Sequence, residues 1–223
     1  MENFFWSDPL SHTAFPVAKP GYGVIGASAF ATAIFAIIGL TALAFFGLVV
    51  TFFVCWFFRD PDRVIPSKEG AVVSPADGKV IIRDIVEDCP FMEGPCLKIS
   101  IFMSIFNVHV NRIPYEGTIS RVVYNPGKFF TANLDKASQD NEQNAIVLKT
   151  ENDKKICFVQ IAGLVARRII CGVQEGDSLS RGQRFGMICF GSRLDVYLPS
   201  DTKPKVFIGE KVKAGTSVLG YLK

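Results

Sequence analysis

An uncharged segment dominates the hydropathy pattern of the N-terminal part of the chain. From Pro20 to Phe58 no side chain carries a charge. A membrane crossing takes about 20 apolar residues, and one straight helix over this segment would be roughly 57 Å long, against a bilayer core of about 30 Å. The pattern therefore predicts a helical hairpin over 20–58, with its turn near Gly39 or Gly47. One tilted span preceded by an interfacial segment is the alternative. A buried core helix is disfavoured because such helices rarely stay uncharged for so long.

The charges beside this segment indicate its orientation. Residues 1–19 form a polar lead-in with Glu2 and Asp8, and they lack the basic cluster of a signal peptide. Basic residues flank the segment on both sides, namely Lys19, Arg59, Arg63 and Lys68. Positive charge at both ends suits a hairpin whose ends lie in the cytoplasm. We therefore expect a membrane anchor over 20–58 in the cell membrane, with the following domain on the cytoplasmic side.

The pattern changes after a turn-rich linker at 59–63. Short β-branched runs then alternate with Gly, Pro and Asp, which is typical of strands joined by turns. Residues 151–153 predict a hairpin turn, whereas 129–136 and 164–170 favour helices. The runs that predict strands lie within 71–86, 96–114, 117–127 and 144–163.

A faint internal repeat adds to this prediction. Residues 176–182 and 209–215 share the pattern of a glycine, a short strand-like pair and a second glycine. Glycine suits such turns because it adopts positive φ without steric cost. The pattern resembles the hammerhead turns of biotinyl and lipoyl carrier domains. We expect a mainly β (α+β) domain over 59–223, a barrel-like β sandwich with hammerhead-type turns and a few helices.

Composition and charge narrow the functional classes. The chain has 223 residues, 49% of them hydrophobic, and a formal net charge of +3. No dense basic stretch interleaves with aromatic residues, so a nucleic-acid partner is not expected. The six cysteines form neither a C-x-x-C pair nor a zinc spacing, which predicts no metal site and favours a reducing compartment.

Gly191 and Ser192 lie between two apolar, strand-like runs near the C-terminus. A serine hydroxyl can attack the carbonyl of the preceding residue, and glycine there has no Cβ to obstruct the attack and tolerates a strained backbone. β-Elimination of the resulting ester would convert the serine into a pyruvoyl group. This ketone forms a Schiff base with an amine and accepts the electron pair left by departing CO2. A Gly-Ser pair alone is common in loops, so its context decides.

That context is given by four separate motifs in one order. They are SPADGKV at 74–80, FNVHVNRIP at 106–114, IAGLVARRI at 161–169 and FGMICFGSRLDVYLP at 185–199. Together they resemble phosphatidylserine decarboxylases of the short (type A) form. The resemblance covers 59–223. It extends to the presence of a hydrophobic anchor, although not to the details of the anchor's sequence.

The resemblance implies a pyruvoyl-dependent carboxy-lyase of phospholipid biosynthesis that is made as a zymogen. Autocatalytic cleavage of the Gly191–Ser192 bond would leave chains 1–191 and 192–223 associated as a heterodimer. The pyruvoyl cofactor would come from Ser192. The substrate would be phosphatidylserine in the membrane, and the products phosphatidylethanolamine and CO2. The anchor agrees with a substrate that cannot leave the bilayer.

The resemblance also assigns roles to a histidine and a carboxylate. His109 is one of only two histidines in the chain, and histidine suits proton removal and return near neutral pH. Asp77 would be the carboxylate of a Ser-His-Asp-like set that orients His109 while His109 activates Ser192. By residue type alone, Asp77 is equally an Asx-type turn residue. Longer bacterial members carry a second histidine three residues after the first, where this chain has Arg112.

The phosphate of the substrate favours a nearby cation, and Arg167 and Arg168 are the candidates. A solvated helix face is an equally good interpretation of that pair. Phe129 and Phe130 could line an acyl path, although core packing explains them as well.

Two other functional classes fit parts of the sequence. The first is a membrane-anchored serine hydrolase using Ser192, His109 and Asp77, but the chain has no G-x-S-x-G motif. The second is a non-enzymatic carrier or adaptor, because Asp135-Lys136-Ala137 mimics a lipoyl-lysine motif. The residues around Lys136 lack the tight hairpin that such a lysine needs. The intact mass of the protein distinguishes a hydrolase from a pyruvoyl enzyme, because a hydrolase stays one chain whereas a pyruvoyl enzyme is cut after Gly191.

Overall fold

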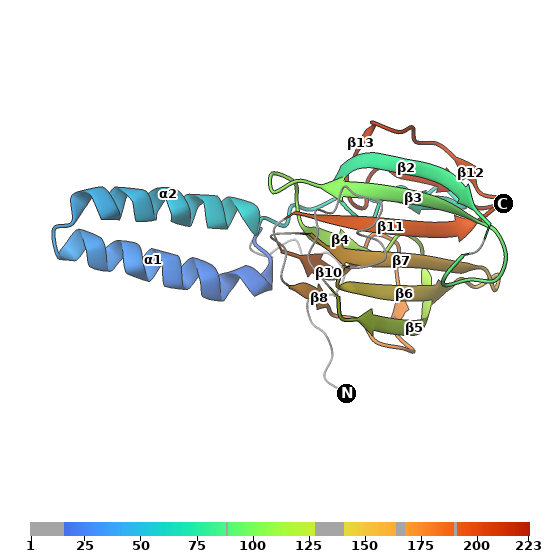
Figure 1. Ribbon diagram of the computed structural model, residues 1–223, viewed down its shortest axis with the longest axis horizontal. Helices are drawn as coiled ribbons and strands as arrows, with labels where there is room; N and C mark the ends of the chain where they lie inside the picture. The colour runs from blue at the N-terminus through green and yellow to red at the C-terminus, as the bar shows by residue number, and fades with distance from the viewer. Residues whose placement is uncertain (1–15, 88, 128–140, 164–167, 190) are drawn as a thin grey trace. The chain divides into compact units, whose positions relative to one another are not determined.

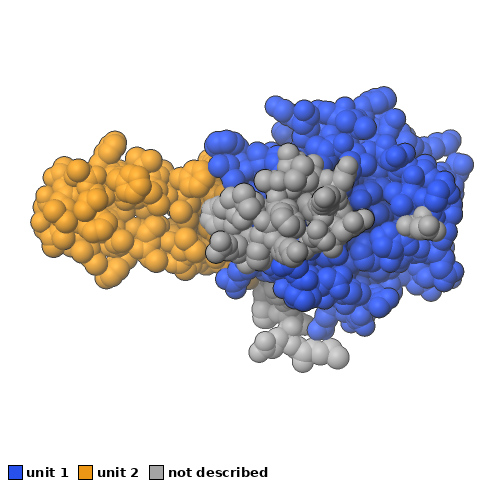
Figure 2. Space-filling view, viewed as in Figure 1, with its two compact units in different colours: residues 1–10, 63–223 blue, residues 11–62 orange. Residues whose placement is uncertain are grey.

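The computed structural model describes residues 16–87, 89–127, 141–163, 168–189 and 191–223. The chain divides into two compact units (Figure 2). The helical unit is Ser11–Asp62, and the β unit contains Arg63–Lys223. Each unit is described by itself below.

The helical unit is an antiparallel pair of helices. A short 3-10 helix, Lys19–Gly21, leads into α1 (Tyr22–Ile37), and α2 (Thr41–Phe57) follows a tight turn (Figure 1). The turn is made at Gly39, whose φ of 78° favours glycine. Gly47, the other predicted turn position, lies inside α2, where an added Cβ would approach Thr32 Oγ1 to 2.6 Å. The predicted hairpin with its turn at Gly39 is therefore confirmed, and Gly47 serves close helix packing instead.

The side chains of these helices face outward. None of the described residues of α1 is buried, and in α2 only Phe57 is. The helical stretch Lys19–Ile37 is long and apolar enough to cross a membrane, and Thr41–Phe57 is apolar but shorter. Outward-facing apolar side chains on both helices are stable in hydrocarbon, because transfer to water exposes their whole apolar surface.

The β unit is built on an eight-stranded antiparallel sheet in the order β13-β2-β3-β11-β7-β6-β5-β9. The sheet is curled, and two three-stranded sheets, β4-β10-β8 and β1-β14-β12, accompany it (Figure 1). The mainly β fold predicted from the sequence is confirmed. The strands are β1 (Ala71–Val73), β2 (Gly78–Val86), β3 (Cys96–Met103), β4 (Val110–Arg112), β5 (Gly117–Asn125), β6 (Gln143–Lys149), β7 (Lys155–Ala162), β8 (Ile169–Cys171), β9 (Ser178–Leu179), β10 (Arg184–Ile188), β11 (Ser192–Pro199), β12 (Lys203–Pro204), β13 (Lys211–Val212) and β14 (Val218–Tyr221).

The main core follows from strand alternation. Side chains of successive residues point to opposite faces, so every second residue of β3 and β11 enters one cluster. Ile99, Ile101, Leu194 and Val196 are fully buried there and pack with Phe158 of β7. The opposite face carries a smaller cluster that includes Cys157 and Tyr197. The central strands are therefore buried on both faces.

The internal repeat forms the two edges of the large sheet. In each copy a two-residue strand, β9 or β13, lies between two glycines with positive φ. Their φ values are 91° at Gly176, 78° at Gly182, 93° at Gly209 and 73° at Gly215. The repeat seen in the sequence is thus a repeated turn-strand-turn unit.

One predicted helix is wrong where the structure describes it. Residues 164–170 were expected to be helical, but Ile169 and Ile170 belong to β8 and pair with Ile188 and Met187 of β10. A short apolar run suits either element, and tertiary pairing decides between them. The other predicted helix, 129–136, lies outside the described residues, as do Phe129, Phe130 and Lys136. The hairpin turn at 151–153 is confirmed, with Asp153 at a φ of 59°.

Candidate functional site

Ser192 begins β11, a central strand of the large sheet. It is aligned with Met103 of β3 on one side and Ala162 of β7 on the other. Its side chain is fully buried, and Oγ donates a hydrogen bond to the Met103 sulfur at 3.3 Å. A thioether is a weak acceptor, so the hydroxyl is shielded from water without being held by a strong hydrogen bond.

Gly191 precedes Ser192 in the left-handed conformation, with a φ of 71°. A Cβ at this position would lie 3.9 Å from Ile105 Cγ2 and 4.0 Å from the Met103 carbonyl oxygen, which are ordinary contacts. The backbone conformation, and not lack of space, therefore favours glycine here. Glycine adopts this left-handed conformation without steric cost, so the backbone before Ser192 takes a geometry that other residues would resist.

Replacing Gly191 by alanine is expected to lower the free energy of unfolding by about 1–2 kcal/mol, because L-residues with a Cβ resist this conformation. Asparagine tolerates it better, so Gly191→Asn should cost less. Chemical unfolding followed by circular dichroism measures both, in a chain that also carries Ser192→Ala. Equal losses for the two variants would contradict a backbone origin.

His109 lies beside the Gly191–Ser192 bond, although 82 residues separate it from Gly191. The loop after β3 brings it there, and a turn between Ser104 and Asn107 closes that loop with a 2.8 Å hydrogen bond from Ser104 Oγ to Asn107 Oδ1. The Gly191 N–H points at His109 Nε2 at 3.3 Å, and His109 Nδ1 lies 2.9 Å from the Asn107 carbonyl oxygen. The ring itself is fully buried.

These two contacts fix the tautomer of His109. An amide N–H can only donate and a carbonyl oxygen can only accept, so Nε2 carries a lone pair and Nδ1 carries the proton. The basic nitrogen of the imidazole is therefore directed at the backbone of the Gly191–Ser192 segment. This arrangement can accept a proton close to the Gly191–Ser192 bond.

Asp77 lies in the turn before β2, where its carboxylate is bound on both oxygens. Oδ1 accepts the Ala214 N–H at 2.7 Å, and Oδ2 accepts Arg63 Nη2 at 2.8 Å. The Pro75 carbonyl oxygen of the same turn accepts the N–H of Arg112 at 2.9 Å, three residues after His109. The described contacts of Asp77 thus differ from those expected of a carboxylate on His109, whose Nδ1 faces Asn107.

The arginines expected near the site fall into different environments. Arg112 is buried and donates from Nη1 to the Gly182 carbonyl oxygen at 3.0 Å, so the second histidine position is occupied by a residue that secures a turn. Arg168 is exposed, and its carbonyl oxygen accepts the N–H of Cys189, two residues before Gly191. Arg167 lies outside the described residues. Of the predicted anion-binding pair, Arg168 is therefore placed near the segment that contains Gly191 and Ser192.

Comparison with known proteins now decides the family. The family model described as phosphatidylserine decarboxylase matches residues 50–220. The chain belongs to the phosphatidylserine decarboxylase family. It is 56% identical over 178 residues to the phosphatidylserine decarboxylase proenzyme of Syntrophus aciditrophicus, which covers 80% of this chain and 84% of that relative. It is 47% identical over 207 residues to the proenzyme of Desulfotalea psychrophila, with 93% and 97% covered.

Sequence reasoning missed the buried charges next to Ser192. Arg193 is fully buried on the opposite face of β11 and forms a two-pronged ion pair with Asp195, with Nε–Oδ1 at 2.6 Å and Nη2–Oδ2 at 3.1 Å. Lys98 Nζ also lies 3.2 Å from Asp195 Oδ2, and Ser100 Oγ accepts from Arg193. The cluster ties the first residues of β11 to β3.

Replacing Asp195 by asparagine is expected to lower the free energy of unfolding by about 3–5 kcal/mol, because it leaves Arg193 buried without its counter-charge. Glu116→Gln is the matched control. Glu116 makes the same two-pronged contact with Arg181, but its side chain is 42% exposed. That control should cost at most about 1 kcal/mol. Comparable losses, measured by chemical unfolding in the Ser192→Ala background, would show that burial is not decisive.

A second missed feature is a chain of buried amides behind Ser192. Gln160 Nε2 donates to Asn111 Oδ1 at 2.9 Å, and Gln160 Oε1 accepts from Asn144 Nδ2 at 3.2 Å. Asn111 in turn contacts the sulfur of Met103, which also receives the Ser192 hydroxyl. Gln160 is the one polar residue in the apolar run of β7, which is the sequence signal for such a buried partner. The network positions Met103 against Ser192.

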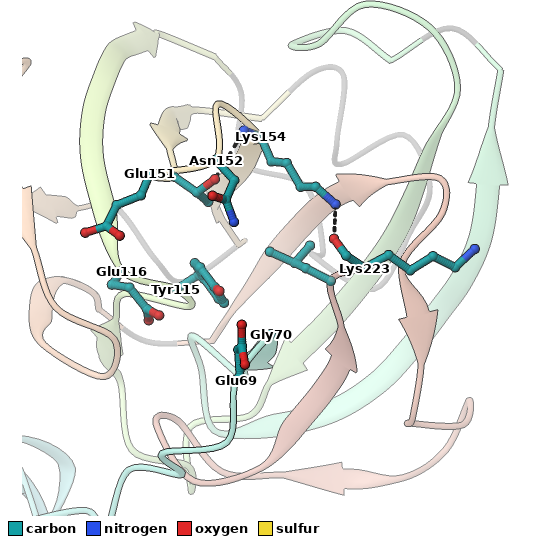
Figure 3. A pocket seen from close by; sticks show the side chains of 10 residues that line it. Glu69, Gly70, Tyr115, Glu116, Glu151, Asn152, Lys154 and Lys223 are labelled. Carbon is teal, nitrogen blue, oxygen red and sulfur yellow. Dashed lines mark hydrogen bonds between the residues drawn. The ribbon is translucent and has the colours of Figure 1, made fainter.

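The described residues also line a cavity of about 450 Å³ far from this site (Figure 3). It lies by the β6–β7 hairpin, where Lys154 donates to the carbonyl oxygen of Lys223. Ser192 is aligned with Ala162 at the other end of β7, about 20 Å away at the rise of a strand. Its lining carries three glutamates (Glu69, Glu116 and Glu151) and two lysines (Lys154 and Lys223), so its charge does not mark it as a site for an anionic lipid headgroup. The cavity is therefore separate from the candidate active site.

Proposed function

We propose that this protein decarboxylates phosphatidylserine to phosphatidylethanolamine and CO2, after cleaving its own Gly191–Ser192 bond to form a pyruvoyl group from Ser192. The observation that carries the proposal is the contact between the Gly191 N–H and the lone pair of His109 Nε2, beside a buried Ser192. The relatives named above are phosphatidylserine decarboxylase proenzymes, which supports both the reaction and a precursor.

In the maturation step His109 is the group that transfers protons. Ser192 Oγ attacks the carbonyl carbon of Gly191 while His109 Nε2 takes the hydroxyl proton. His109 returns that proton to the Ser192 nitrogen as the C–N bond breaks, which leaves an ester. His109, neutral again, then takes the Cα proton of residue 192, and the electrons of that C–H bond form a C=C bond as the Gly191 carboxylate leaves with the electrons of the C–O bond. Water finally releases ammonia from the dehydrated residue and leaves a ketone.

The surroundings of Ser192 fit such a ketone. Position 192 is fully buried between Met103 and Ala162, so the group would be protected from bulk water. The ketone supplies an electrophile for the primary amine of the substrate and a sink for the electron pair released with CO2. His109 is then available to return a proton to the product carbon. Exposed Arg168 is our candidate for the substrate phosphate.

The two product chains would remain one molecule. Residues 192–223 include β11, which is hydrogen-bonded along its length to β3 and β7 in the middle of the sheet. Asp77 adds a link, because its carboxylate accepts the Ala214 N–H across the two chains. We therefore propose a heterodimer of chains 1–191 and 192–223, with Asp77 as a positioning residue in it. The apolar helices support a location at the cell membrane, and we place the β unit on the cytoplasmic side.

The test is CO2 release from phosphatidylserine labelled in its carboxyl group, in mixed detergent micelles with the purified protein. Phosphatidylserine acetylated on its amine is the matched control substrate. The natural lipid should release CO2, and the acetylated lipid should release none, because it cannot react with a ketone. Equal release from both would contradict the proposed chemistry.

A further inference from the structure

An exposed apolar pair lies at one edge of the large sheet, outside the candidate active site. Phe207 is 66% exposed and Ile208 is 64% exposed, and they are consecutive in the turn that leads into β13. Single exposed apolar residues are ordinary on protein surfaces, but two adjacent ones at the tip of a turn are a candidate contact surface. Four basic residues lie near this pair: Arg83 lies over the Phe207 ring, Lys205 and Lys211 flank the turn in the sequence, and Lys79 pairs with Lys211. One acidic residue, Glu210, lies in the same turn. We define the edge patch as Phe207, Ile208, Lys79, Arg83, Lys205 and Lys211.

Hydrogen bonds hold the turn of the edge patch in place. The Gly209 N–H donates to the Val80 carbonyl oxygen at 2.8 Å, and the Phe207 N–H donates to Glu210 Oε2 at 3.0 Å. Arg83 Nη1 donates to the Val206 carbonyl oxygen at 3.1 Å, and its guanidinium lies 5.4 Å from the centre of the Phe207 ring. The apolar tip is therefore presented in a fixed conformation, which lowers the entropy cost of binding.

The lysines of the edge patch repel each other. Lys79 of β2 and Lys211 of β13 are direct cross-strand partners, and like charges in that position are destabilising. The sheet has a second such pair, Lys149 and Lys155, but there Lys149 Nζ contacts Asp153 Oδ1 at 2.8 Å. Among the ion pairs of the described residues, none includes Lys79 or Lys211. The edge patch thus keeps a positive charge that an external anion could neutralise.

The exposed apolar tip and the basic residues near it together indicate which kind of partner the edge patch binds. Lysines alone would suit an edge strand that avoids pairing with other chains. An exposed Phe-Ile tip has the opposite effect, since it favours association. Apolar side chains that enter the boundary of headgroups and acyl chains, ringed by Lys and Arg, match an anionic membrane surface. The long stems of lysine keep their charge at the headgroups while the tip inserts.

The geometry points to the edge patch as a docking surface that holds the β unit against an anionic bilayer. The β unit begins at Arg63, directly after the helical unit ends at Asp62, so a membrane-embedded helical unit keeps the edge patch at a high effective concentration near lipid. The docking itself requires only anionic lipid. The choice of phosphatidylserine as the natural lipid rests on the proposed function.

Docking at this edge would serve the candidate active site. Lys79 is the cross-strand partner of Phe102, and Phe102 is the partner of Arg193, the residue after Ser192. Neighbouring strands lie about 4.8 Å apart, which puts the Cα atoms of Lys79 and Arg193 roughly 10 Å apart in one row of the sheet. The basic end of the edge patch and the start of β11 are therefore on the same end of the sheet.

Hydrogen–deuterium exchange of the full chain in lipid nanodiscs tests this docking. One disc contains only phosphatidylcholine, and the other also contains phosphatidylglycerol, which is anionic but lacks the amine and carboxylate of serine. Amides of residues 203–213 should exchange more slowly in the anionic disc. Salt at about 1 M should remove the difference, because it reduces the Debye length to about 3 Å.

Two matched double variants locate the effect. Lys79→Gln with Lys211→Gln should weaken docking about 30-fold, if each lysine contributes as basic residues usually do at anionic surfaces. Lys149→Gln with Lys155→Gln changes the net charge equally at the other lysine pair and should leave the protection intact. Phe207→Ser with Ile208→Ser removes the apolar tip and should likewise reduce the protection.

Several outcomes would overturn the docking proposal. They are equal exchange in the two discs, an equal effect of the two lysine pairs, or protection that depends on protein concentration and not on lipid, which would indicate a second copy. Hydrogen–deuterium exchange is measured without any catalytic turnover. Protection in an inactive protein would therefore support docking and contradict only the proposed function. An active protein without protection contradicts docking alone.

Discussion

Ser192→Ala is expected to leave a single chain of 24.5 kDa without decarboxylase activity. The variant lacks the oxygen that attacks Gly191 and the atoms from which a ketone could form. The loss should be complete, because no other group can supply the electron sink that decarboxylation needs. Intact mass spectrometry measures the first effect, by the absence of the 32-residue fragment 192–223. Release of labelled CO2 measures the second.

Ser120→Ala is the matched control for this experiment. Ser120 lies on β5, and its Oγ donates a hydrogen bond to the carbonyl oxygen of Val147 on β6 at 3.0 Å. Its loss removes the same hydroxyl without touching the candidate site, so cleavage and activity should persist. Phenylhydrazine should add to fragment 192–223 of the control and to no part of the Ser192→Ala chain. A Ser192→Ala protein that is still cut and active would falsify the self-cleavage proposal.

The sequence predicts those parts of the fold that depend on local patterns. The uncharged run over 20–58 is long enough for two helices and offers two glycines for their turn, Gly39 and Gly47; the structure turns at Gly39. The repeated glycines at 176–182 and 209–215 predict turns for the same conformational reason. The apolar run at 169–170 has no glycine that would mark its element type. It forms a strand because it pairs with β10.

The candidate site could be predicted in its residues but not in its contacts. Ser192 and His109 were identified from motifs, whereas their approach depends on β11 inserting between β3 and β7, which no local pattern encodes. Asp77 shows the limit of residue type: a carboxylate before a strand can orient a histidine or bind a backbone N–H, and here its described partners are Arg63 and Ala214. Asn107 takes the position on Nδ1 because it lies two residues from His109 and closes the same loop.

His109→Ala is expected to slow cleavage of the Gly191–Ser192 bond by about 100-fold or more, the usual contribution of a general base. The ring is the described acceptor of the Gly191 N–H, which Nε2 receives on its lone pair. The substitution also opens a cavity in a buried position, which small bases can enter. Added imidazole should therefore restore part of the rate. The measurement is the time course of precursor disappearance, followed by intact mass after synthesis in a cell-free system.

Val108→Ala separates proton transfer from packing. Val108 is buried next to His109 in the same loop, so its truncation also leaves a cavity and costs about 1–3 kcal/mol of stability. It keeps the imidazole, and cleavage should slow by less than about 10-fold, with no response to added imidazole. If the two variants slow cleavage equally and neither responds to imidazole, His109 acts only by supporting the loop. In that case the base must be sought among the other groups around Met103 and Ser192, because the lone pair on Nε2 would have no chemical role.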